Sequence, residues 1–191
     1  MSKLRNISNS LAGKLAMTGG ALFAADGILQ IVHPQHTGSQ VVGLAGHLNI
    51  AFFLTALILV SPMFVVLARY ARPGRAQKAA HAAALGTFVL GLTCISSLVM
   101  GHDGVWFNVI APLTNAAWLF GSMVLAISLK RGGRVPTLVA VALPVAWVAT
   151  IPLAAVGGGL ISGAYFLGVG QLAASDAIER RPAPLVQPAS A

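Results

Sequence analysis

Six apolar runs of about 20 residues follow one another along the chain, and each is long enough to cross a lipid bilayer as a helix. A helix satisfies its backbone hydrogen bonds within the segment, which the apolar part of a membrane requires. The sequence therefore predicts an all-α, polytopic integral membrane protein with six transmembrane helices in a compact bundle. The predicted spans cover approximately residues 14–33, 47–68, 80–100, 105–129, 136–156 and 158–174.

The overall composition agrees with this prediction. Hydrophobic residues make up 57% of the chain and charged residues only 8%, whereas a soluble domain has about a quarter charged residues. We expect residues 1–175 to form one transmembrane domain. Residues 176–191 are rich in Pro and Ala and lack core-forming residues, so we expect a flexible cytoplasmic tail. The single cysteine, Cys94, excludes a disulfide within the chain.

The basic residues predict how the chain is oriented. The chain has 12 Lys and Arg residues and a net charge of +8, and these residues fall before the first span, after alternate spans, and in the tail. Basic loops mark the cytoplasmic side, so we expect both termini to be cytoplasmic and the charge to face the lipid bilayer rather than nucleic acid. The Ala- and Gly-rich composition favours a high-GC bacterium, and hence a bacterial cytoplasmic membrane. The clusters are Lys3, Arg5 and Lys14; Arg69, Arg72, Arg75 and Lys78; Lys130, Arg131 and Arg134; and Arg180 and Arg181.

Small residues and prolines predict details of helix packing. Gly159 and Gly163 have the GxxxG spacing that lets membrane helices approach closely; we expect them to pack within the bundle rather than to form a dimer. Prolines inside the spans should kink or locally break their helices. They are Pro62, Pro112, Pro144 and Pro152.

An acidic residue, Asp26, lies deep within the first apolar run. Gln30 and His33 follow it at i+4 and i+7, which places the three on one face of a helix. A carboxylate facing lipid costs roughly 2.5–3.5 kcal/mol on insertion scales. Asp26 should therefore face the bundle interior and have a polar partner.

Other polar and aromatic residues lie at the same, non-cytoplasmic ends of the spans. This arrangement predicts a polar pocket that opens toward that side. The simpler alternative is that the histidines and Asp103 are loop-end residues that meet water and lipid headgroups. The candidate partners are His36, His47, Asn49, His102, Asp103, Trp106, Asn108, Asn115 and Trp118.

The first functional hypothesis is a membrane-embedded acid–base enzyme of the cyclase or isomerase type, acting on a lipid-soluble, isoprenoid-like substrate. Burial disfavours the charged form of a carboxyl, so Asp26 could serve as a general acid while a histidine relays the proton. The candidate catalytic residues are Asp26, His33, His102 and Asp103. The candidate substrate-binding residues are Gln30, His47, Asn49, Trp106, Asn108, Asn115 and Trp118, with Phe107 completing an aromatic wall for a developing cation.

Two other hypotheses stay open. In one, the chain is a small transporter, an immunity or resistance protein, or an accessory subunit, and six short helices would then favour a homo-oligomer. In the other, His33, His36, His47 and His102 hold a metal or a haem. The histidines cluster at helix ends rather than inside two helices, so we assign no metal ligand and expect no cofactor. No nucleotide-binding loop or hydrolase motif is present.

Overall fold

The computed structural model describes residues 2–34, 41–71 and 74–175, with side chains from residue 9 onward. Within these ranges the chain forms six α-helices and no strand, which confirms the predicted all-α class and helix number. The tail 176–191, His36 and the basic residues Arg72, Arg180 and Arg181 lie outside the described residues. The helices are α1 (Ser2–Val32), α2 (Gly43–Ala68), α3 (Arg75–Met100), α4 (Phe107–Gly132), α5 (Thr137–Thr150) and α6 (Gly159–Ala174).

Four of these helices are long and apolar enough to cross a membrane. They are α1 from Asn9 onward, α2, α3 and α4. The helices α5 and α6 are apolar but shorter, with 14 and 16 residues. The composition and length of the helices are thus those of a small membrane protein.

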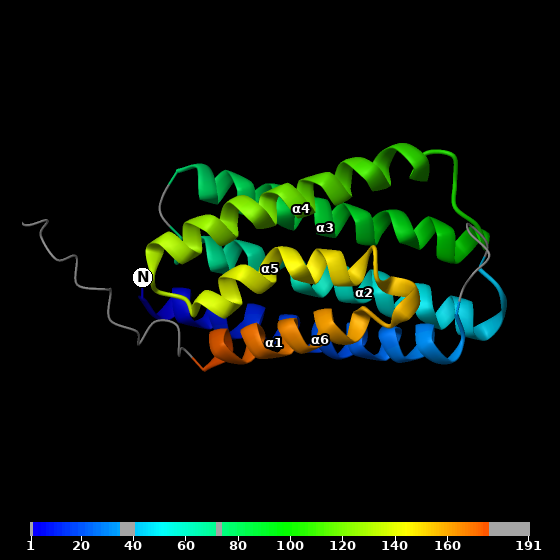
Figure 1. Ribbon diagram of the computed structural model, residues 1–191, viewed down its shortest axis with the longest axis horizontal. Coiled ribbons are helices and arrows are strands. Elements are labelled where there is room, and N and C mark those ends of the chain that lie inside the picture. The colour runs from blue at the N-terminus through cyan, green and yellow to red at the C-terminus, as the bar shows by residue number, and fades with distance from the viewer. Residues whose placement is uncertain (1, 35–40, 72–73, 176–191) are drawn as a thin grey trace, which may run out of the picture.

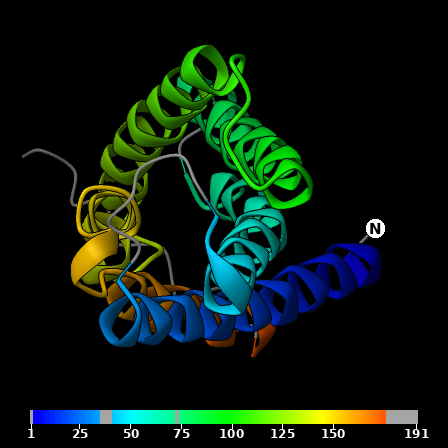
Figure 2. The same cartoon turned by 90° about the vertical axis from the view of Figure 1, so that its right-hand side faces the viewer.

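Consecutive helices run antiparallel along the long axis of the molecule (Figure 1). Viewed from the end, they follow one another around the bundle (Figure 2). Each helix packs against the next, and α6 packs along α1, which closes the ring. This order puts the first residue of every odd-numbered helix and the last residue of every even-numbered helix at the same end of the bundle.

The predicted fifth span, 136–156, is not one continuous helix. The helix α5 ends at Thr150, and a short 3-10 helix, Ala154–Val156, follows a turn. Pro152 has no N–H to donate to the carbonyl of Val148, and the N–H of Leu153 donates to it instead, at 3.2 Å. By contrast, Pro62, Pro112 and Pro144 lie inside α2, α4 and α5, which continue past them.

The contact between α1 and α6 is built on glycines. A Cβ added at Gly20 would lie 2.8 Å from the carbonyl oxygen of Gly163, and one added at Gly163 would lie 2.6 Å from that of Gly20. The two backbones therefore touch directly, as the GxxxG spacing predicted, and they do so within the bundle. We call this contact the glycine seam; it comprises Gly13, Gly20 and Gly27 on α1 and Gly159, Gly163 and Gly170 on α6.

Aromatic side chains fill the core next to the glycine seam. The ring of Phe23 stacks on that of Phe166, with centroids 5.8 Å apart. Phe53 meets the edge of Phe23, and Phe64 meets Phe166. Phe23 and Phe166 are fully buried, so this cluster joins α1, α2 and α6 in the interior.

Candidate functional site

The two ends of the bundle differ in the residues they present. The described Lys and Arg side chains lie toward the end where α2, α4 and α6 finish: Lys14, Arg69, Arg75, Lys78, Lys130, Arg131 and Arg134. We call this the basic end. His33, His47, His102 and Asp103 lie at the opposite end.

Asp26 is buried between α1 and α2 and is bound by the amide of Asn49, which Gln30 binds in turn. Nδ2 of Asn49 donates a hydrogen bond to Oδ1 of Asp26, at 2.5 Å. Nε2 of Gln30 in turn donates to Oδ1 of Asn49, at 2.9 Å. Asp26 is 5% exposed and Asn49 8% exposed. Asp26, Gln30 and Asn49, which we call the Asp26 site, therefore form one continuous chain of hydrogen bonds across the helix pair.

The local sequence explains this arrangement. Asp26 and Gln30 are four residues apart on α1, so they share the face that packs on α2. Asn49 lies in the second turn of α2, where the antiparallel pairing brings it to the level of Asp26. The amide of Asn49 can donate and accept at once, which allows it to bridge the other two side chains.

The surroundings of Asp26 are neutral. No described Lys, Arg or His forms an ion pair with its carboxyl, and no described residue donates a hydrogen bond to Oδ2. Phe23 lies three residues before Asp26, and Phe53 lies four residues after Asn49. The aromatic cluster is therefore about one helical turn closer to the basic end than the carboxyl of Asp26. The site thus combines one proton-binding group, two neutral amides and an aromatic layer.

The structure does not bring the predicted histidines to Asp26. His33, His47 and His102 are all exposed. Nδ1 of His47 is 2.7 Å from the carbonyl oxygen of Gly43, one turn earlier on the same helix. Nδ1 of His102 is 3.1 Å from the backbone oxygen of Asp103. All three lie near helix ends, and their side chains are at the surface rather than in the interior.

Asp103 is also separate from the Asp26 site. Its Oδ1 accepts a hydrogen bond from Oγ of Ser97 at 2.7 Å. Ser97 lies in the last turn of α3, so Asp103 fastens the connection between α3 and α4 to the end of α3. This contact gives Asp103 a structural role at the end opposite the basic end.

The predicted polar stripe on α4 is divided between two environments. Asn115 is half-buried, and its Oδ1 accepts a hydrogen bond from Nε1 of Trp147 on α5, at 3.0 Å. Asn108 is exposed. The reason is the length of α5: it ends three residues after Trp147, so the turn of α4 that carries Asn108 extends beyond it.

The predicted aromatic wall on α4 does not form. Trp106 is 47% exposed, whereas Trp118 is fully buried in the core. Nε1 of Trp118 and Oγ of Ser122, one turn further on, have no hydrogen-bond partner among the described residues. The aromatic residues about one turn from the Asp26 site along α1 and α2 are instead Phe23 and Phe53, and Phe166 of α6 stacks on Phe23.

The histidines also do not gather into a metal site among the described residues. Within this part of the chain, no group of three His, Cys, Asp or Glu side chains is placed to hold a metal ion.

The sequence also did not predict a pair of polar clusters, one toward each end of the bundle. Near the basic end, Asn9 is fully buried; its Nδ2 donates to Oη of Tyr70 at 3.0 Å, and Nη1 of Arg69 donates to its Oδ1 at 2.7 Å. At the opposite end, Oγ1 of Thr150 donates to Oγ of Ser162 at 2.6 Å. Asn9 lies before the predicted first span, so nothing in the sequence indicated that its side chain is buried. A hydroxyl in an apolar helix gives no sign of its partner.

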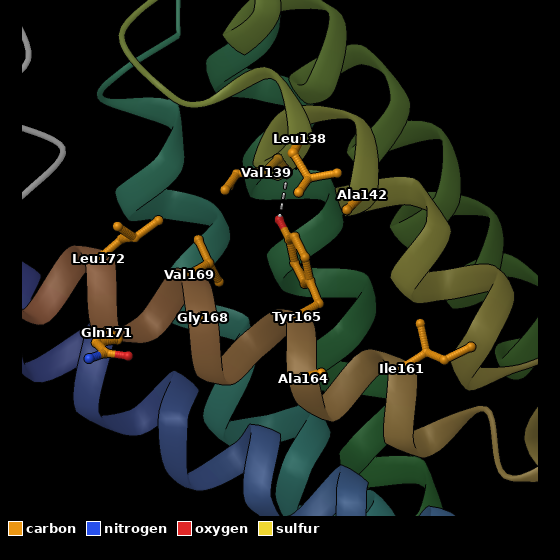
Figure 3. Close-up of a pocket in the computed structure, with 10 residues that line it drawn as sticks. All are labelled: Leu138, Val139, Ala142, Ile161, Ala164, Tyr165, Gly168, Val169, Gln171 and Leu172. Atoms are coloured by element: carbon orange, nitrogen blue, oxygen red, sulfur yellow. Dashed lines mark hydrogen bonds between the residues drawn. The ribbon is translucent and has the colours of Figure 1, made fainter.

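A groove lies between α5 and α6, with a volume of about 480 Å³. Tyr165 reaches across it from α6, and its hydroxyl donates to the carbonyl oxygen of Val139, at 3.2 Å (Figure 3). None of the predicted site residues lines this groove. Its lining residues are Leu138, Val139, Ala142, Ile161, Ala164, Tyr165, Gly168, Val169, Gln171 and Leu172.

Comparisons with protein-family models, with curated proteins and with solved structures give no match for this chain. Its function must therefore be inferred from its own residues and their geometry.

Proposed function

We propose that this chain is a small integral membrane protein that acts through reversible protonation of Asp26, as an acid–base enzyme on a lipid-soluble substrate. The observation that supports this most directly is the buried carboxyl with only neutral amide partners. An unpaired buried charge is costly, so the carboxyl requires either a proton or a bound cation to neutralise it.

The hydrogen bonds leave one carboxyl oxygen for chemistry. Asn49 occupies Oδ1, and Gln30 orients Asn49 in turn. A proton on Oδ2 is then the one the site can donate. Phe53, which is only half-buried, lies against Phe23 on the side toward the basic end, and its ring is the one that can stabilise a cation that forms when a double bond is protonated. An isomerase or cyclase of an isoprenoid-like molecule needs this combination of an acid and an aromatic wall.

Infrared spectroscopy of the protein in lipid tests whether Asp26 carries the proton. The wild type should show a carboxylic acid C=O band that is absent from Asp26→Asn. Asp103→Asn is the matched control, because it makes the same change at an acid outside the Asp26 site, and it should keep the band. A band that persists in Asp26→Asn would contradict the proposal.

Comparison of lipid extracts tests the enzyme itself. Cells that express the wild type should accumulate a lipophilic product with the mass of its precursor but a different retention time, since isomerisation and cyclisation conserve mass. Asp26→Asn should abolish this product at equal protein abundance, and Asp26→Glu should restore part of it. Identical extracts from the wild type and Asp26→Asn would rule out an enzyme of this class.

A proton-coupled carrier is the second candidate, favoured by the position of Asp26 between two helices. A change in its protonation alters the hydrogen bond that joins α1 to α2, and so could shift these helices. Such a small bundle would work as a homo-oligomer. The carrier predicts proton-linked flux into proteoliposomes, with loss of that flux in Asp26→Asn.

A further inference from the structure

The α5–α6 groove is apolar and opens at the surface of the bundle (Figure 3). Leu138 is 79% exposed and Ile161 53% exposed. A Cβ added at Gly168 would meet no atom within 4 Å, so the groove is open at that point. Because α6 packs along the candidate membrane helix α1, the groove lies at the depth of the apolar spans. The molecules that surround such a surface in a membrane are acyl chains.

One end of the groove lies toward the end of the bundle that carries the described basic side chains. Leu138 and Leu172 lie at the basic end, where α5 begins and α6 finishes. Arg134 is exposed in the connection that leads into α5, four residues before Leu138. The first N–H groups of α5 also point toward this end and carry the positive end of the helix dipole. The described acids, Asp26 and Asp103, lie toward the other end.

We propose that the α5–α6 groove is a binding site for one anionic phospholipid. One of its two acyl chains lies in the groove, across Ala164 and Gly168, and its phosphate lies against Arg134 and the first turn of α5. A volume of about 480 Å³ is within the range of small-molecule sites in proteins. Electrostatic attraction to basic residues at a membrane surface favours an anionic over a zwitterionic headgroup. This site is independent of Asp26 and of the function proposed for it.

Native mass spectrometry of the full chain in mild detergent tests the proposal. Phosphatidylglycerol and phosphatidylcholine with identical acyl chains are added separately, and the bound lipid is counted. We expect one phosphatidylglycerol per chain, bound about fivefold more tightly than phosphatidylcholine, the ratio that one basic contact provides. Equal affinity for the two lipids would overturn the proposal.

Two variants test the position of the acyl chain. Ala164→Phe should fill the groove and abolish binding of both lipids. Gly168→Leu should also block the groove and abolish binding of both lipids. A side chain at this position meets no core atom, so the core should not be disturbed. Ala82→Phe is the matched control: Ala82 is an exposed alanine on α3 outside the groove, and its substitution should leave binding unchanged. Wild-type binding in both groove variants would place the lipid elsewhere.

A further pair of variants tests the headgroup contact. Arg134→Gln should remove the preference for phosphatidylglycerol while the acyl chain still binds. Arg75→Gln changes an exposed arginine at the same end, at the start of α3, and should keep the preference. Equal loss in both variants would contradict a specific contact at Arg134. A wild-type dimer that Ala164→Phe converts to monomers would show that a second copy of the chain occupies the groove, and would overturn the lipid site.

Discussion

At the scale of single residues, Asn49 links the two parts of the Asp26 site. It donates to the carboxyl of Asp26 and accepts from Gln30. Gln30 is half-buried, near the end of α1, where water or headgroups could replace a lost partner. Asp26 is more deeply buried and has no other described donor. Loss of the Asn49 side chain should therefore leave the carboxyl of Asp26 without a hydrogen-bond donor, whereas Gln30 can find another partner.

We expect Asn49→Leu to lower the free energy of unfolding by about 1–3 kcal/mol, the usual cost of leaving a buried polar group without its partner. The double variant Asp26→Leu/Asn49→Leu should recover most of this loss, because replacing both partners by apolar groups removes the unsatisfied carboxyl. Thermal unfolding in a mild detergent measures the stability of the single and the double variant. Additive losses in the double variant would mean that the two side chains do not stabilise each other.

The sequence predicted the Asp26 site only in part, for physical reasons. Helical spacing placed Asp26 and Gln30 on one face, and the order of spans placed Asn49 at the same end. Both statements follow from the backbone alone. The positions of His33 and His102 could not be derived in this way, because they depend on how terminal turns and loops fold. The buried amide of Asn9 donates a hydrogen bond to Tyr70, 61 residues away, and no local pattern indicates such a contact.

At the scale of helices, the glycine seam determines how closely α1 and α6 approach. Gly13, Gly20 and Gly27 recur every seven residues, so they form one stripe on α1. Their spacing was visible in the sequence, but the identity of the helix they contact was not. Similarly, Pro152 predicted a break in the fifth span. Because Pro152 lies near the end of that predicted span, 136–156, it did not predict that α5 would already end at Thr150.

Adding one methyl group to each of two glycines of α6 tests the glycine seam. In Gly163→Ala, the new Cβ would lie 2.6 Å from the carbonyl oxygen of Gly20, so α1 and α6 must separate. We expect a loss of about 1–3 kcal/mol, as for other overpacked contacts. Gly168→Ala is the matched control, because its Cβ meets open space, and it should be neutral or up to about 1 kcal/mol stabilising. Thermal unfolding in detergent compares the two. Equal stability of both variants would argue against close contact at the glycine seam.

At the scale of the whole molecule, charge divides the bundle into two ends. The described Lys and Arg side chains lie toward one end, and three of the four described histidines, His33, His47 and His102, lie at the other. This division agrees with the alternation of basic loops in the sequence. If the basic end is cytoplasmic, as basic loops favour, the residues at the start of α2 face the opposite side of the membrane.

Cysteine labelling in intact cells tests this orientation. Cys94 is buried and is first replaced by alanine. A membrane-impermeant maleimide should then label His47→Cys, which is exposed at the end opposite the basic end, but not Lys78→Cys, which is exposed at the basic end. Permeabilised cells provide the control, since both variants should react there. Labelling of Lys78→Cys alone in intact cells would reverse the orientation.

The unequal lengths of the helices have a consequence for the surrounding bilayer. At 1.5 Å per residue, the 26 residues of α2 extend roughly 39 Å, whereas the 14 residues of α5 extend only roughly 21 Å. The hydrocarbon region of a bilayer is about 30 Å thick. If all six helices cross a bilayer, the protein presents two different hydrophobic thicknesses to it, and lipids beside the helical parts of α5 and α6 would compress to meet the shorter one. A molecule of this shape would then deform the membrane on one flank only, and would be drawn to regions where the membrane is already thin.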